Sequence, residues 1–288
     1  MGHYLSKAEV DQYQSEGYLV VSSLLEREDI ERVDRVIEEV VLSAIGSGDY
    51  GKILELEPQT VDGHPVVRRI YNPFEHHNTF KALATNDRLL DRVESLVGPS
   101  IQLQHSKLNM KLARVGSPVE WHQDLTYFPH TNTDLVTVLV YLDAATRENG
   151  CLQVLSRCHH QFLDCHTPEG LFAGMITEDI SRYGRSVPLE APGGSAIFMH
   201  CMTPHSSLPN RSNHPRRTLI FEYRAADSYP IYFGPQVADA EQHAHHLRGQ
   251  RARYARMGGP PPLIPVMPDN FKSLYQLQED TKARGTTQ

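Results

Sequence analysis

The sequence predicts a mainly β protein with flanking α-helices, whose core is a barrel or a jelly roll. Amphipathic helical patterns dominate residues 1–98, and after them short segments rich in β-forming residues alternate with Gly, Pro, Asn and Asp. Many short strands at close spacing are typical of such β folds. Because no internal repeat or flexible linker interrupts the chain, we expect one domain over residues 1–288, with a β core at 99–226 and a C-terminal helix and tail at 227–288.

The first helix is expected to begin after Ser6. Ser6-Lys7-Ala8-Glu9 has the pattern of a capping box, in which the first and fourth side chains bind each other's backbone amides. This helix should end near Gly17. The apolar, β-prone run YLVVSSLL follows it.

A second amphipathic helix is predicted at about residues 28–44, because apolar residues recur there at helical spacing. The segment GSGDYGK, at 46–52, is expected to be a loop. Two shorter helical stretches are predicted within 79–97, and Gly98-Pro99 should end them.

The β core is expected to contain five clear strands. These are residues 101–113, 135–142, 150–155, 194–200 and 217–225. A helical pattern returns at about 238–256. The proline-rich GGPPPLIPVMP, at 258–268, is expected to be an extended strap across the surface, and the last ten residues are expected to be frayed.

Composition argues against several classes of partner. The net charge is −7 and the pI about 6.1, so we expect no nucleic-acid or membrane partner. A basic cluster at Arg248, Arg251, Arg253 and Arg256 is interpreted as a solvated helix face. The four cysteines form no CxxC pair and are expected to be reduced, and neither a secretion signal nor a membrane span is evident. We therefore expect a soluble cytoplasmic protein, monomeric or homodimeric.

The candidate active-site motif is WHQD, at residues 121–124. In a strand, residues i and i+2 point to the same face, so His122 and Asp124 would project together as two ligands of one metal ion. A polar tripeptide in a surface β-turn is the alternative interpretation.

Later residues favour the metal site. The strands on either side of Glu148-Asn149-Gly150 are expected to pair as a hairpin, and His205 and Arg216 follow in a turn-rich region. Two histidines and one carboxylate form the facial triad of non-haem Fe(II) oxygenases. The planar fork of an arginine beyond the metal can bind the far carboxylate of a 2-oxo acid co-substrate.

The order HxD…ENGCL.V…GG.A.F…H.S..N.S…R, with the N-terminal DQYQSEGYLVV, resembles the phytanoyl-CoA dioxygenase-type Fe(II)/2-oxoglutarate oxygenases. The resemblance covers about residues 5–225. It implies a double-stranded β-helix core, a cupin-like jelly roll, flanked by helices. It also implies Fe(II) as cofactor, 2-oxoglutarate as co-substrate and O₂ as oxidant.

The resemblance assigns roles residue by residue. His122, Asp124 and His205 match the iron ligands. Arg216 matches the arginine that binds the C5 carboxylate of 2-oxoglutarate, and Ser207 matches a hydroxyl that supports the same carboxylate.

Two further positions match the co-substrate region of the family. Asn109 matches an amide that contacts the co-substrate, and Arg69 aligns with a basic residue near the cofactor or substrate. The chain also departs from the family. The usual Pro-Gly-Ser-His turn is SRCH here, at 156–159, and Val140 and Tyr141 stand where several members carry a tryptophan. The changed turn leaves the substrate open.

Several assignments have rivals. His200 competes with His205 as a ligand, but the spacing to later family positions favours His205. His105 is either a pocket residue or a satisfied core histidine. Tyr127 and Phe128 are either substrate contacts or core aromatics.

The long insert between the core strands contains Phe172, Met175 and Ile176. It is either a lid over the metal face, with Met175 near the substrate, or a surface loop with its own small core.

The predicted function is hydroxylation of an aliphatic C–H in a small metabolite or natural-product intermediate of secondary metabolism, with release of succinate and CO₂. Asp124 occupies the position that related halogenases leave to chloride, so halogenation is disfavoured. Desaturation, epoxidation, cyclisation and acyl-CoA hydroxylation remain alternatives, as do a metal-holding binding protein and a zinc hydrolase.

Overall fold

The computed structural model describes residues 2–48, 50–231, 241–260 and 272–285, and there two antiparallel sheets face each other. The larger sheet contains, in order of pairing, β1 (Tyr18–Val21), β9 (Ala196–His200), β6 (Leu135–Tyr141), β11 (Arg216–Ala225), β4 (Ile101–Lys111), β3 (His64–Tyr71) and β2 (Leu54–Val61), with β12 (His245–Arg248) also paired to β4. The smaller sheet contains β5 (Val119–His122), β10 (His205–Ser207), β7 (Leu152–Val154) and β8 (Val187–Pro188). The predicted jelly-roll, double-stranded β-helix core is confirmed.

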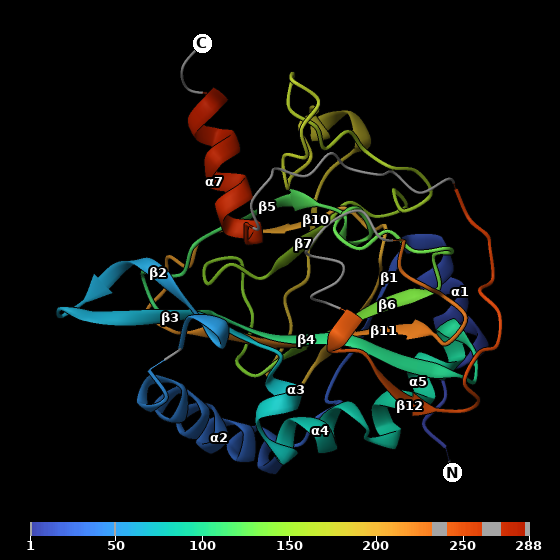
Figure 1. The fold of residues 1–288 in the computed structure, drawn as a ribbon, viewed down its shortest axis with the longest axis horizontal. Helices are drawn as coiled ribbons and strands as arrows, with labels where there is room; N and C mark the ends of the chain where they lie inside the picture. The colour runs from blue at the N-terminus through green and yellow to red at the C-terminus, as the bar shows by residue number, and fades with distance from the viewer. Residues whose placement is uncertain (1, 49, 232–240, 261–271, 286–288) are drawn as a thin grey trace.

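The helices flank this core. They are α1 (Lys7–Glu16), α2 (Arg27–Gly46), α3 (Pro73–His76), α4 (Asn78–Ala84), α5 (Asp87–Val97) and α7 (Leu274–Gly285), with short 3-10 helices η1 (Tyr50–Lys52), η2 (Asp124–Thr126) and η3 (Ile180–Tyr183). Figure 1 shows α2, α4 and α5 on one side of the larger sheet and the smaller sheet on the other. The space between the two sheets is therefore separate from the helix-covered core.

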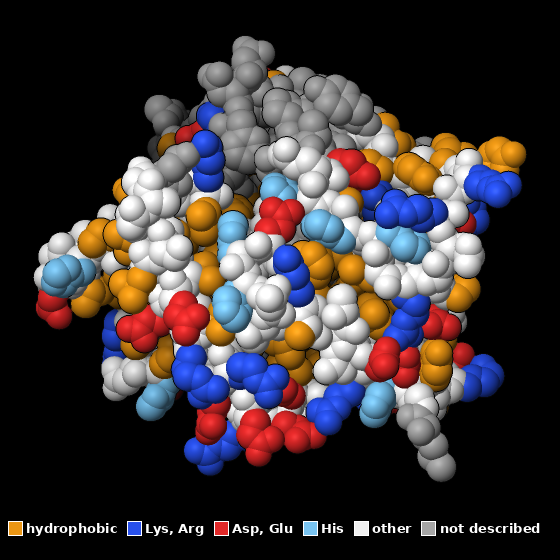
Figure 2. Space-filling model, turned by 60° about the horizontal axis from the view of Figure 1, so that its bottom comes forward, with side chains coloured by type: hydrophobic (Ala, Val, Ile, Leu, Met, Phe, Trp, Pro, Cys, Tyr) orange, Lys and Arg blue, Asp and Glu red, His pale blue; other side chains and the backbone are white. Residues whose placement is uncertain are grey.

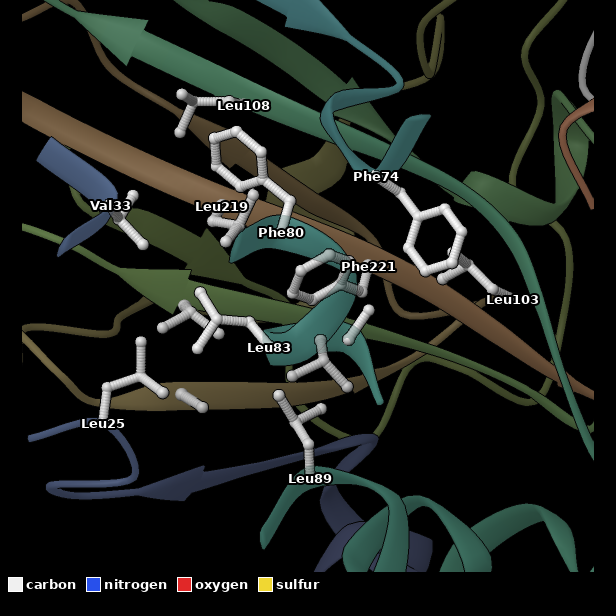
Figure 3. Packing of buried hydrophobic residues seen from close by; sticks show 14 of the residues in the cluster. Leu25, Val33, Phe74, Phe80, Leu83, Leu89, Leu103, Leu108, Leu219 and Phe221 are labelled. Atoms are coloured by element: carbon white, nitrogen blue, oxygen red, sulfur yellow. The ribbon is translucent and has the colours of Figure 1, made fainter. Parts of the chain in front are cut away.

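The main hydrophobic core lies between the helices and the larger sheet (Figure 3). Leu219 and Phe221 of β11 and Leu108 of β4 pack there with Val33 of α2 and Phe80 of α4, and all five side chains are fully buried. Burial of each such side chain contributes about 1.5–3 kcal/mol to stability. This packing holds the sheet whose other face lines the inter-sheet space.

A β-bulge decides which residues of β4 face that space. The pairing of β4 with β11 shifts between Glu222↔His105 and Tyr223↔Leu103, so β4 has one extra residue, Gln104. Leu103 therefore packs with the helices, whereas His105, two residues later, faces the smaller sheet.

Several local predictions are confirmed. Ser6 and Glu9 form both hydrogen bonds of the capping box, and α1 ends at Gly17, whose φ is +82°. The predicted second helix is α2, and the two stretches before Gly98 are α4 and α5. The loop expected at 46–52 contains the short η1, and the β2–β3 hairpin was not predicted.

The predicted β6–β7 hairpin is wrong. The strand β6 pairs with β9 and β11 in the larger sheet, whereas β7 pairs with β10 and β8 in the smaller one. The turn that contains Asn149 and Gly150 therefore carries the chain from one sheet to the other. A turn sequence alone does not distinguish a hairpin from such a crossing.

The C-terminal predictions are also corrected. In the described part of the helix expected at 238–256, residues 245–248 instead form β12 beside β4, where Arg248 forms ion pairs of 2.8 and 3.0 Å with Asp91 and Glu94. The Arg248–Arg256 cluster is therefore not a helix face. The prediction that the last ten residues are frayed is wrong for 279–285, which continue α7, and residues 286–288 lie outside the described residues. The expected strap at 258–268 lies outside the described residues from 261 onwards.

Basic and acidic side chains are interspersed on the face shown in Figure 2. All four cysteines are free, as expected. Among the described residues, we find no helix with the length and apolar character needed to cross a membrane.

Candidate metal centre and cavity

Three side chains converge between the sheets. His122 ends β5, Asp124 begins η2, and His205 begins β10 directly opposite His122. Asp124 Oδ1 lies 3.6 Å from His122 Nε2 and 3.5 Å from His205 Nε2. In the part of the chain that the structure describes, this is the one group of at least three His, Cys, Asp or Glu residues whose ligand atoms lie close enough to hold a metal ion. The predicted placement of Asp124 on the strand is wrong, because the turn into η2 brings it towards His122.

Hydrogen bonds orient all three residues. The Nδ1 atoms of His122 and His205 lie 2.8 and 2.9 Å from the carbonyl oxygens of Glu120 and Thr203. A carbonyl only accepts, so each Nδ1 carries the proton and each Nε2 keeps its lone pair for a metal. Burial also lowers the pKa of His122 well below its usual value and thus favours the neutral imidazole. The donor set therefore fits Fe(II), with two imidazoles and one carboxylate.

The metal centre opens into a cavity of about 160 Å³. Arg216, the first residue of β11, lines it and is 4% exposed. Its guanidinium donates to Gly150 O (2.6 Å) and Thr218 Oγ1 (2.7 Å), while its Nε has no partner. No carboxylate of the described residues lies within 4.0 Å of it, so a buried cation faces the cavity without a counter-ion. Such a charge is costly unless an anion binds.

Two other residues predicted for the co-substrate form a pair in the wall. Arg69 of β3 donates from Nε to Asn109 Oδ1 of β4 (2.8 Å), and Glu55 lies 3.7 Å from its guanidinium. Ser207 of β10 is buried and lines the same cavity. The structure thus brings Arg69, Asn109, Ser207 and Arg216 together with the metal centre.

Three of the four predicted substrate residues also line the cavity, namely His105, Tyr127 and Phe128. Tyr127 is buried, and its hydroxyl donates to Gly174 O. The ring of Phe128 lies 4.8 Å from that of His105 between centroids. All three therefore belong to the wall of the site.

Met175 does not line the cavity, which is a correction. Phe172 packs edge-on against Tyr127 at 4.9 Å, in a small cluster with Cys165 and Leu277. The insert therefore has its own small core, which joins the cavity wall to α7. Of the two interpretations offered by the sequence, a surface loop with its own small core describes the insert better than a lid.

His200, the rival of His205, lies apart from the metal-ligand group. Its Nδ1 accepts a hydrogen bond from Met202 N (3.1 Å), and its ring lies 5.0 Å from that of His159. Burial lowers the pKa of His200 to about 3. These contacts give it a structural place near α1.

Four residues of the site were not predicted. Thr137 donates to Asp124, Lys107 and Glu222 form an ion pair, and Tyr275 of α7 lies against Arg69. Strand alternation could have indicated two of them, since Lys107 follows His105 by two positions and Glu222 follows Arg216 by six. The sequence held no local signal for the others.

The fold and the His–Asp–His group define a non-haem Fe(II) oxygenase. The chain belongs to the phytanoyl-CoA dioxygenase (PhyH) family, whose model matches residues 13–218. It is 28% identical over 262 residues, covering 88% of this chain and 90% of the other, to a Stutzerimonas stutzeri protein described as "Probable alpha-ketoglutarate-dependent hypophosphite dioxygenase". It is 27% identical to methylphosphonate hydroxylase from Gimesia maris, covering 78% and 83% of the two chains. The crystal structure of EctD from S. alaskensis with bound Fe superposes with a TM-score of 0.72 at 21% identity, covering 86% and 88%. The predicted family and enzyme class are confirmed.

Proposed function

We propose that this Fe(II)- and 2-oxoglutarate-dependent dioxygenase hydroxylates a small metabolite, with His122, Asp124 and His205 as the iron ligands and Arg216 as the residue that binds 2-oxoglutarate. One observation carries the proposal. The buried guanidinium of Arg216 lacks a carboxylate partner among the described residues and faces the same cavity as the His–Asp–His group. A dicarboxylate with one end at the metal and the other at Arg216 satisfies both.

Iron, when bound, supplies the activation of O₂, coupled to decarboxylation of 2-oxoglutarate to succinate and CO₂. The chain's own residues bind and orient 2-oxoglutarate and exclude water. Arg216 binds the distal carboxylate, with Ser207 and Asn109 beside it. The side chains of Leu139, Leu152 and Ile220 line the cavity and keep it partly apolar. Such a lining strengthens the charge contacts and limits side reactions with water.

The size of the site favours a small substrate. A cavity of about 160 Å³, close to the roughly 150 Å³ cavity that binds benzene in another protein, must hold 2-oxoglutarate as well, so little room is left for the substrate. Hypophosphite and methylphosphonate, the substrates named for two relatives, are compounds of a few heavy atoms. Hydroxylation would give a product heavier by one oxygen atom, which mass spectrometry distinguishes from desaturation or cyclisation.

We also propose that the chain works in the cytoplasm as a single domain, monomeric or homodimeric. Four free cysteines, three of them buried, support a reducing compartment.

Anaerobic addition of Fe(II) and 2-oxoglutarate tests the proposed function. We expect the weak visible charge-transfer band of the bound co-substrate, saturable in both components. Protein that binds Fe(II) but gives no band would contradict the oxygenase assignment. It would favour a metal-holding binding protein or a zinc hydrolase, although neither function explains why Arg216 lines the cavity.

A further inference from the structure

A second charged cluster lies in the cavity wall, away from Arg216. Glu222 Oε1 of β11 lies 3.0 Å from Lys107 Nζ and 3.0 Å from His105 Nε2, both on β4. All three residues line the cavity. Glu222 is also the register partner of Thr137 on β6, whose hydroxyl binds Asp124. The cluster therefore lies in the row of residues next to the metal centre.

His105 in this cluster has two unused polar atoms. Its side chain is about 6% exposed, and neither ring nitrogen has a hydrogen-bond partner among the described residues, because the 3.0 Å contact of Nε2 with Glu222 lacks hydrogen-bond geometry. A buried polar atom without a partner costs about 1–3 kcal/mol. Because His105 lines the cavity, a ligand that enters beside Phe128 can supply the missing hydrogen bond.

This cluster is separate from the 2-oxoglutarate end of the cavity. Arg216 pairs in register with Lys111, six residues beyond His105 on β4. Six residues of a strand span about 20 Å. The guanidinium of Arg216 reaches back to Thr218, the register partner of Asn109, which lies two residues (about 7 Å) from Lys107 and four residues (about 13 Å) from His105. A molecule held at His105 and Lys107 therefore lies beside the carboxylate held at Arg216 and does not take its place.

The charges of the wall favour an anionic substrate. The ionisable lysines, arginines and carboxylates that line the cavity are Arg69, Lys107, Lys111, Arg216, Lys272, Asp124 and Glu222. The negative charges of Glu55 and Asp280, which do not line the cavity, balance the positive charges of Arg69 and Lys272. The two positive charges of Fe(II) balance the two negative charges of the 2-oxoglutarate dianion. Burial lowers the pKa of Lys111, but its Nζ donates to the carbonyls of Ser117, Ser207 and Leu208, which requires all three hydrogens of an ammonium. With Lys111 charged, one positive charge remains in excess.

We propose that Lys107 and His105 form the substrate subsite, that Glu222 holds Lys107 in place until substrate arrives, and that the ligand is a small phosphorus oxyanion such as an alkylphosphonate or hypophosphite. This inference rests on the proposed function. An ammonium and an imidazole beside Phe128 suit a compact oxyanion that carries a small apolar group. In turnover, one oxygen atom of O₂ enters the C–H or P–H bond and the other enters succinate, while 2-oxoglutarate supplies two electrons as it loses CO₂.

The test uses ³¹P NMR of methylphosphonate and of hypophosphite with full-length protein that carries Mn(II) in place of Fe(II) and 2-oxoglutarate. Bound Mn(II) broadens the signal of a nearby phosphorus nucleus without turnover. We expect saturable broadening for wild type, at least tenfold weaker binding for Lys107→Met, and retained binding for Lys107→Arg. Lys7→Met is the matched control, because Lys7 also pairs with a carboxylate but lies exposed on α1.

The variant Glu222→Gln tests the proposal more directly than the Lys107 variants. If Lys107 holds the anion, removal of the competing carboxylate should tighten binding several-fold. Loss of binding in Glu222→Gln, with the Fe(II)–2-oxoglutarate band and thermal unfolding intact, would overturn the assignment, because Glu222 would then be required for the anion to bind instead of competing with it for Lys107.

Two other outcomes would also overturn it. Wild type could show the 2-oxoglutarate band but no broadening, which would remove the oxyanion subsite and leave the proposed function standing. In ¹H NMR with the same Mn(II)-loaded protein, an amino acid such as L-proline could instead show Lys107-dependent broadening while neither phosphorus compound binds, which would replace the phosphorus oxyanion by a carboxylate. Absence of the band itself would count against the proposed function.

Discussion

The hydroxyl of Thr137 donates a 2.8 Å hydrogen bond to Oδ2 of Asp124. Thr137 lies on β6 of the larger sheet, whereas His122 and His205 lie on β5 and β10 of the smaller one. The hydrogen bond occupies Oδ2, so Oδ1 faces the two imidazoles. Oδ1 lies 3.6 Å from Nε2 of His122 and 3.5 Å from Nε2 of His205. The larger sheet thus sets the orientation of the carboxylate for ligands held by the smaller sheet.

Replacement of Thr137 should weaken iron binding. Thr137→Val keeps the shape but removes the donor, so we expect about tenfold weaker Fe(II) affinity, in the range found for hydrogen-bond partners of metal ligands. Thr137→Ser should stay close to wild type. Competition with a chromogenic chelator measures the affinity. An unchanged Fe(II) affinity in Thr137→Val would show that the bond does not orient Asp124.

Paired histidine variants separate the two candidate ligands. His205→Ala should lose the Fe(II)–2-oxoglutarate band and succinate formation, because one of three ligands is removed. His200→Ala should keep the band, since its Nδ1 is bound to Met202 N and it lies outside the ligand group. The reverse pattern would show that the ligand is misassigned.

Arg216→Met should raise the Kd of 2-oxoglutarate by about 10–100-fold, since a hydrogen bond to a charged group contributes about 1.5–3 kcal/mol. Arg217→Met is the matched control. Arg217 is bound to Asp143 and Asp34, so its loss should affect stability but not the Kd. Titration of the charge-transfer band measures both variants. Equal effects of the two changes would contradict the role of Arg216.

Much of this site could be predicted from the sequence, because its signals are local or have fixed spacing. The capping box at Ser6, the alternation of apolar residues in the strands, and the order of His122, Asp124, His205 and Arg216 all belong to this kind. Each depends only on neighbours along the chain or on the family pattern.

The rest depends on contacts that no local pattern encodes. The bulge at Gln104 reverses the alternation of β4, so Leu103 packs against the helices although His105, two residues later, faces the cavity, and no local pattern shows where that reversal occurs. The hydrogen bond from Thr137 to Asp124 joins two sheets. The contact of Tyr275 with Arg69 likewise depends on where α7 packs, more than 200 residues later in the chain.

Acid should destabilise the fold through His130. Its side chain is 2% exposed, and burial, with Arg224 beside it, lowers its pKa from 6.5 to about 3. Between these two values the unfolded chain binds a proton that the folded chain does not, so stability falls as the pH falls. We expect about 2 kcal/mol to be lost from this group between pH 7 and pH 5.

Urea unfolding at the two pH values measures this loss. In His130→Gln the loss between pH 7 and pH 5 should be smaller by about that amount, whatever the variant's stability at pH 7. An unchanged pH dependence would show that His130 is not the group responsible.

Gly150 connects the turn between the sheets to the co-substrate end of the cavity. Its φ is +77°, and a Cβ there would lie 2.2 Å from the backbone oxygen of Leu208, while its own carbonyl accepts from Arg216. Gly150→Ala must therefore move the turn and with it the carbonyl that accepts a hydrogen bond from Arg216.

Gly170, with φ +81° and open space around its Cβ position, supplies the control. Gly170→Ala should cost only the left-handed strain, about 1–2 kcal/mol, and leave the Kd of 2-oxoglutarate unchanged. Gly150→Ala should cost more in urea unfolding and also raise that Kd, whereas equal effects of the two alanines on both quantities would show that the turn does not position Arg216.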